Sequence, residues 1–164
     1  YLRHRSVHCS PFPPTPDPTT SLPLAKSPLM REHRLYQADW LMHFYVFGRD
    51  EIVSGGSADG MLDLAIDPKL AWALRNRGQF PVDINRADRE ALLRVPGLGT
   101  KVVAKILETR RHRRMRLEDV GRICQSIAKL RPFIIAEGWS PGAVTDKTGL
   151  RDTIVRSCEQ LSLF

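Results

Sequence analysis

The stretch Val95-Pro96-Gly97-Leu98-Gly99 predicts a tight turn between two helices. Pro96 ends the helix before it, because proline lacks an N–H and its ring clashes with the preceding helical turn. Gly97 and Gly99 flank one apolar residue, and they allow a sharp turn that exposes main-chain N–H groups at the start of the next helix. Those donors and the helix dipole favour a bound phosphate. The stretch therefore predicts an anion-binding hairpin.

The sequence on both sides of this hairpin is helical. Asp88 is placed to cap a first helix that ends at Pro96. A second helix is expected from Thr100 towards His112. It would bury Val102 or Val103, Ile106 and Leu107 and leave Lys101, Lys105 and Arg110 in water.

Residues 85–116 thus predict one helix-hairpin-helix element that grips duplex or damaged DNA without reading bases. The formal net charge of +7 favours a polyanionic partner, although ribosomal and membrane-surface proteins share such a charge. The alternative is a tight helix–helix turn beside a solvated charged face. The predicted DNA-binding residues are Pro96, Gly97, Leu98, Gly99, Thr100, Lys101, Lys105, Arg110, Arg113 and Arg114.

The remaining sequence predicts a mainly α protein with no evident strand pairing. A Pro-rich disordered arm or linker covers residues 1–28, and an amphipathic helical linker segment covers residues 29–78. The helix-hairpin-helix domain follows at 79–137, and a flexible tail at 138–164. Shorter features are a helix over 29–47, a loop over 50–60, a helix from Asp67-Pro68 to about Gly78, and a helix from Leu117 to about Leu130.

Composition indicates a soluble, cytoplasmic protein without membrane spans. No apolar run approaches the length that crosses a bilayer, and the basic start lacks the apolar core of a secretory signal. Three separated cysteines suggest neither a disulfide framework nor a metal knuckle. His4, His8 and Cys9 lack a fourth ligand, so no metal site is expected.

Two longer stretches carry a family resemblance. Residues 29–41, Leu-Met-Arg-Glu-His-Arg-Leu-Tyr-Gln-Ala-Asp-Trp-Leu, and residues 62–74, Leu-Asp-Leu-Ala-Ile-Asp-Pro-Lys-Leu-Ala-Trp-Ala-Leu, resemble the carboxy-terminal region of bacterial putative DNA modification/repair radical SAM proteins. Residues 82–120 resemble the helix-hairpin-helix domains of competence DNA receptors and repair proteins.

The resemblance implies an accessory DNA-binding region of a repair or modification enzyme. That family binds an iron–sulfur cluster and S-adenosylmethionine through a Cys-x-x-x-Cys-x-x-Cys motif in an amino-terminal barrel, and this sequence has no such motif. No cofactor and no catalytic residue are therefore expected here, and both cofactors are expected only where a barrel exists elsewhere. Leu117–Phe133 stands where tandem elements place a second hairpin, but it has Cys124-Gln125-Ser126-Ile127 instead of Pro-Gly-x-Gly.

Two alternatives come from other classes of function. Lys101 and Asp119 imitate the Lys and Asp of DNA glycosylases with this hairpin, which suggests a small glycosylase or abasic-site lyase acting through a Schiff base. Asp119 also fits the first turn of a helix, where the dipole favours acids. The last five residues resemble a sliding-clamp-binding peptide, which suggests a clamp-tethered adaptor without catalysis; they are Gln160, Leu161, Ser162, Leu163 and Phe164.

Overall fold

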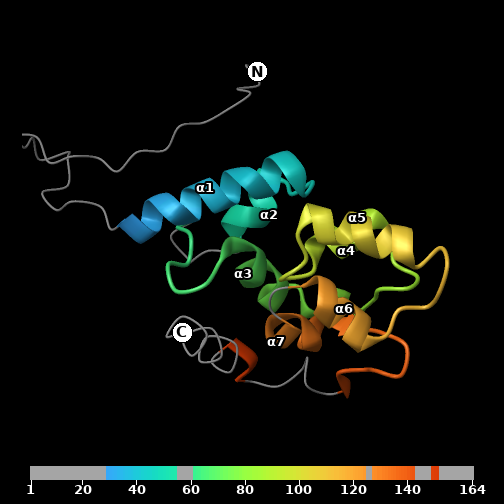
Figure 1. Ribbon diagram of the computed structural model, residues 1–164. Coiled ribbons are helices and arrows are strands. Elements are labelled where there is room, and N and C mark those ends of the chain that lie inside the picture. The colour runs from blue at the N-terminus through green and yellow to red at the C-terminus, as the bar shows by residue number, and fades with distance from the viewer. Residues whose placement is uncertain (1–28, 55–60, 125–126, 143–148, 152–164) are drawn as a thin grey trace, which may run out of the picture.

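The computed structural model describes residues 29–54, 61–124, 127–142 and 149–151, and it is mainly helical (Figure 1). The predicted arm, most of the predicted tail and the end of the predicted loop lie outside these residues. The α-helices are α1 (Leu29–Phe44), α2 (Arg49–Ser54), α3 (Pro68–Arg75), α4 (Arg89–Arg94), α5 (Thr100–Thr109), α6 (Leu117–Ile123) and α7 (Ile127–Leu130). Two 3-10 turns, Arg77–Gln79 and Arg131–Phe133, and two short strands complete the described chain.

The amino-terminal helices pack around α3. Asp67 caps α3 as predicted, because its carboxylate accepts a hydrogen bond from the Leu70 N–H at 2.9 Å, and Pro68 occupies the first helical position. The loop prediction for residues 50–60 was wrong over its first part, where α2 forms. Glu51 stabilises α2 by accepting the Gly48 N–H at 2.8 Å.

One hydrophobic core joins the two regions on either side of the domain boundary that was predicted at residue 78. A series of edge-on aromatic pairs crosses this boundary: Phe47 packs on Trp72 with ring centroids 5.2 Å apart, Trp72 on Phe80 at 6.2 Å, and Phe80 on Phe133 at 5.2 Å. Arg94 of α4 also pairs with Glu51 of α2 at 2.6 Å. Helices α1 to α3 therefore form part of the same body as α4 to α7, rather than a linker.

The expectation of no strand pairing was wrong. Strand β1 (Val82–Asp83) pairs in parallel with β2 (Ile134–Ile135), with Val82 opposite Ile134. Two-residue strands are too short to show the alternating pattern by which a strand is recognised in a sequence. The pair brings the segment before α4 next to the segment after α7, so the two ends of the α4 to α7 region lie side by side.

The predicted helix from Leu117 to Leu130 is two helices. Cys124 adopts an extended backbone and ends α6, and α7 begins at Ile127. The predicted second helix of the hairpin is also shorter, since α5 ends at Thr109 instead of His112. Over the described ranges, no helix is both long and apolar enough to cross a membrane.

Candidate nucleic-acid interface

The turn between α4 and α5 has the conformation that its two glycines suggest. Val95 is extended and ends α4, and its carbonyl accepts the Leu98 N–H at 3.2 Å. Gly97 has a φ of 87°, a left-handed conformation that a side chain would strain, and it is exposed. Leu98 is 1% exposed and anchors the turn in the core. We call residues 95–99 the α4–α5 turn.

Helix α5 begins without a side-chain cap. Its N-cap residue is Gly99, which has no side chain to accept a hydrogen bond from the first turn. By contrast, Asp88 caps α4 by accepting the Ala91 N–H at 2.7 Å, as the sequence predicts. The first N–H groups of a helix have no partner inside the helix. The start of α5 therefore presents main-chain donors and the positive end of the helix dipole to a ligand.

Long-range hydrogen bonds hold the turn and its two helices in place. The Asn85 amide bonds both backbone groups of Met115, accepting its N–H at 2.8 Å and donating to its carbonyl at 3.1 Å. Arg110 donates to the carbonyls of Ile84 at 3.1 Å and Ala87 at 2.5 Å. The prediction that Arg110 is exposed to water was wrong, because its guanidinium is partly buried and bonded to these two carbonyls. Both carbonyls are more than 20 residues away in the sequence, so no local pattern indicated the contact.

The other predicted DNA-binding cations differ in whether an acidic side chain already pairs with them. Lys105 lies 3.5 Å from Glu108, and Arg113 lies 2.8 Å from Asp119. Lys101 and Arg114 are exposed and have no side-chain partner among the described residues. The structure thus leaves these two cations the most available for a phosphate.

The lyase hypothesis pairs Lys101 with Asp119, but the described part of the chain contains no ion pair or hydrogen bond between them. One Asp119 oxygen accepts from Arg113, and the other accepts the Arg116 N–H at 3.1 Å at the start of α6. That backbone hydrogen bond, assisted by Arg113, lowers the pKa of the Asp119 carboxyl. Both Asp119 oxygens are therefore already hydrogen-bonded, as expected for an acidic residue in the first turn of a helix. No cluster of metal-ligating side chains occurs among the described residues.

Lys69 is a functional candidate that the sequence analysis did not single out. This α3 residue is 7% exposed, and its Nζ donates to the Leu98 carbonyl at 2.6 Å. The ammonium also lies 4.6 Å from the ring centroid of Tyr45. Burial lowers the Lys69 pKa to about 7, and the Asp67 carboxylate opposes this shift. Lys69 thus links the amino-terminal helices directly to the α4–α5 turn.

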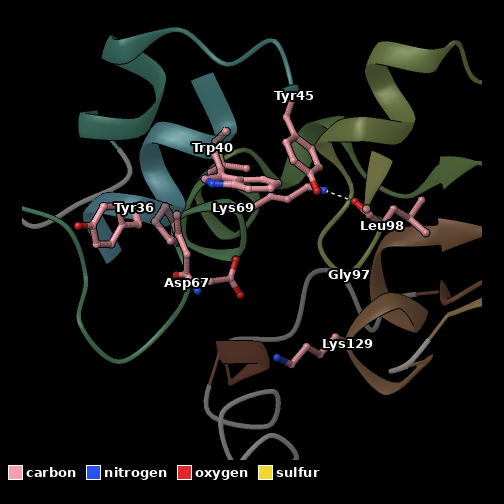
Figure 2. A pocket seen from close by; sticks show the side chains of 12 residues that line it. Tyr36, Trp40, Tyr45, Asp67, Lys69, Gly97, Leu98 and Lys129 are labelled. Atoms are coloured by element: carbon pink, nitrogen blue, oxygen red, sulfur yellow. Dashed lines mark hydrogen bonds between the residues drawn. The ribbon is translucent and has the colours of Figure 1, made fainter. Parts of the chain in front are cut away.

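A cavity of about 540 Å³ opens beside the turn (Figure 2). Aromatic side chains of α1 and its carboxyl-terminal end line one side, and glycines of the α4–α5 turn line another. Figure 2 shows the Trp40 and Tyr45 side chains in the upper part of the view, with Gly97 and Lys129 below them. The lining residues are Tyr36, Gln37, Trp40, Leu41, Tyr45, Asp67, Pro68, Lys69, Gly97, Leu98, Gly99 and Lys129.

The structure therefore brings Gly97, Leu98 and Gly99 together with residues that the sequence analysis assigned to a linker. Lys129 of α7 is a further cation beside the turn, and no pattern in the sequence identified it. The predicted clamp-binding residues 160–164 lie outside the described residues, so that hypothesis stays a prediction. No protein-family model, no curated protein and no solved structure matches this chain.

Proposed function

We propose that α4, the α4–α5 turn and α5 form a helix-hairpin-helix element that binds the DNA backbone independently of base sequence. The observation that carries the proposal is the start of α5, where Gly99 leaves the helix without a side-chain cap. A phosphate oxygen would satisfy the main-chain donors there and interact favourably with the helix dipole. Because phosphates are the same at every step of the duplex, such contacts position the protein without specifying a sequence.

The charges and the rigidity of the region support this reading. Lys101 stands on the first turn of α5 and has no partner among the described residues, so a second phosphate contact costs it no existing ion pair. Leu98 is buried and its carbonyl accepts a hydrogen bond from Lys69, so contacts with the core fix the position of the turn. A turn that is already ordered loses little conformational entropy on binding.

The test is a titration of the full chain with several unrelated duplexes of equal length at a series of salt concentrations. We expect similar affinities for all sequences and a steep fall with salt, because binding to phosphates releases counterions. Replacing Gly97 and Gly99 together by Ala should weaken binding to every duplex. Gly78→Ala is the matched control, since a Cβ at Gly78 meets nothing within 4 Å. Unchanged affinity in a folded double variant would refute the proposal.

We further propose that this region serves a DNA repair or modification enzyme of the radical SAM type. Support comes from the resemblance of residues 29–41 and 62–74 to that family. The second stretch includes Lys69 and Trp72 of α3, which contact Leu98 and Arg94 of the proposed DNA-binding element. The coding DNA upstream of Tyr1 offers a direct test. A reading frame continuous with this chain and carrying a Cys-x-x-x-Cys-x-x-Cys motif is expected, and its absence from the genome would contradict the assignment.

A further inference from the structure

The cavity beside the α4–α5 turn has aromatic walls that phosphate binding does not require. Trp40 is 60% exposed and Tyr36 is 39% exposed, although large aromatic side chains contribute most when they are buried. Both line the cavity, and both come from α1, whose Ala38 and Leu41 are packed in the core. The aromatic side chains are therefore held on an ordered helix with their rings accessible.

The size and chemistry of the cavity suit a small planar ligand. A volume of about 540 Å³ falls within the usual range of small-molecule sites, which combine apolar walls with a few polar groups. The polar groups here include the Asp67 carboxylate and the Lys129 ammonium. Figure 2 shows these two groups on the side of the cavity below the aromatic side chains.

The position of the cavity connects it with the proposed phosphate site. Gly97 and Gly99 belong to both, and a Cβ at Gly99 would lie 3.7 Å from the Tyr45 hydroxyl. In Figure 1 the start of α5 lies on the side of the molecule where α1 and α3 are. A nucleotide whose phosphate binds at the start of α5 thus has its sugar and base close to the aromatic wall.

We propose that this cavity receives one unpaired nucleobase of the bound strand, which stacks on Trp40 while its phosphate lies at the α4–α5 turn. This inference rests on the proposed DNA binding and adds a preference to it. A base inside a duplex must first be unpaired and unstacked, which costs a few kcal/mol, so a base at a bulge, a mismatch or a single-stranded end enters the cavity more readily. Stacking of a base on an aromatic side chain tolerates every base, in keeping with sequence-independent binding. Because the Asp67 carboxylate and the Lys129 ammonium line the cavity beside main-chain donors, a polar nucleotide fits better than an apolar peptide.

The experiment compares three DNA molecules of equal length: a fully paired duplex, the same duplex with one unpaired base, and a single strand. The full chain should bind the unpaired base about tenfold more tightly than the paired duplex, since one base–aromatic stack contributes about 1–3 kcal/mol. The arms also separate the two sources of such a base. A preference for both DNA molecules that have unpaired bases indicates any free base, and a preference for the bulged duplex alone indicates a base displaced from a duplex.

Trp40→Ala should abolish this preference and leave affinity for the paired duplex unchanged. Met42→Ala is the matched control, because Met42 is 38% exposed on the same helix and lines a different cavity. A fluorescent adenine analogue at the unpaired position gives an independent readout: its emission should be quenched on binding to the intact chain and to Met42→Ala, but not to Trp40→Ala.

The outcomes separate this inference from the function on which it rests. If the intact chain binds paired and unpaired DNA equally, the cavity receives no base, and the proposed backbone binding stands. If a preference persists in Trp40→Ala, the base binds elsewhere and the assigned site is wrong. If no DNA binds at all, both proposals fall. The chain has three tryptophans, so the change at Trp40 is the part of the emission change that Trp40→Ala lacks. If bulged DNA produces this change and an apolar peptide neither produces it nor displaces DNA, the nucleobase assignment is supported.

Discussion

Helices α4 and α5 are neighbours in the sequence and in space, yet a side chain caps the amino terminus of α4 and none caps that of α5. At α4 the Asp88 carboxylate accepts the Ala91 N–H, so a side chain supplies both the acceptor and the negative charge. At α5 the corresponding residue is Gly99, and no side chain accepts from the first turn. Replacing a good N-cap residue by Gly costs only a few tenths of a kcal/mol, so α5 forms without a side-chain acceptor. The comparison shows where the chain leaves a favourable position for an anion unfilled.

The largest expected effect comes from making α5 resemble α4. Gly99→Asp places a carboxylate at the N-cap, and the fold should accept it because φ at Gly99 is −86° and a Cβ there has ordinary contact with Tyr45. The carboxylate would take the donors that we assign to a phosphate and would repel the phosphate. We expect duplex affinity to fall about 100-fold, given the cost of several kcal/mol for juxtaposed like charges. Fluorescence anisotropy measures the change.

Gly99→Asn separates capping from charge. Asparagine is as good an N-cap as aspartate but is neutral, so it competes for the donors without repelling DNA. Affinity should lie between that of the intact chain and that of Gly99→Asp, and both variants should be at least as stable to heat as the intact chain. If both variants bind duplex as well as the intact chain, the start of α5 is not a phosphate site.

Lys69 provides the next test, because it holds the Leu98 carbonyl immediately before the start of α5. Its folded-state pKa of about 7 lies below the usual value of 10.5, so between these values the unfolded chain binds more protons than the folded chain. The free energy of unfolding should therefore rise with pH across this window, by about 2 kcal/mol between pH 7 and pH 9. Urea denaturation at each pH measures this dependence.

The variant Lys69→Met should lose that rise, whatever its absolute stability. Lys105→Met serves as the control, since Lys105 is an exposed lysine on α5, and its pH dependence should match that of the intact chain. A rise of equal size in Lys69→Met would mean that another group causes it and that Lys69 is not the buried titrating lysine.

A smaller effect is expected at the cap that is already present. Asp88→Ala removes the side-chain acceptor of α4 and should lower the free energy of unfolding by about 1 kcal/mol. Its carboxylate lies at the other helix, so the duplex affinity of the folded variant should stay within about twofold. Denaturation and anisotropy on the same preparation give both numbers. A large loss of affinity would show that DNA contacts extend to the start of α4 and would weaken the contrast between the two helices.

The features that the sequence predicts are local ones. Asp67, Pro68 and Asp88 act within a few residues of their own positions, so their spacing reveals the caps of α3 and α4. The turn at Gly97 likewise depends on its own backbone. These patterns are sufficient to place the start of α5, on which the proposed function depends.

The features that the sequence does not reveal depend on residues far apart in the chain. The pairing of β1 with β2 joins segments on either side of four helices, and each strand has only two residues. Arg110 looks like any solvated arginine until the carbonyls of Ile84 and Ala87 lie beside it. Lys69 looks like a surface lysine of a short helix, because its burial depends on the turn that packs over it. Tertiary contacts, rather than local pattern, decide these residues.

The smallest expected effect compares two lysines of α5 that differ in their partners. Lys101 is exposed on the first turn without a side-chain partner among the described residues, and Lys105, one turn later, lies 3.5 Å from Glu108. If Lys101 meets one phosphate, Lys101→Gln should reduce the slope of log affinity against log salt by roughly 0.9, the value for one phosphate contact on duplex DNA. Lys105→Gln should reduce it less, because Glu108 already offsets part of the Lys105 charge. Measurements at five or more salt concentrations, with the same duplex throughout, resolve the two slopes. Equal reductions in the two variants would mean that both lysines contact the DNA. An unchanged slope in Lys101→Gln would mean that the DNA does not contact the first turn of α5, and it would contradict the assignment of a phosphate to the uncapped start of that helix.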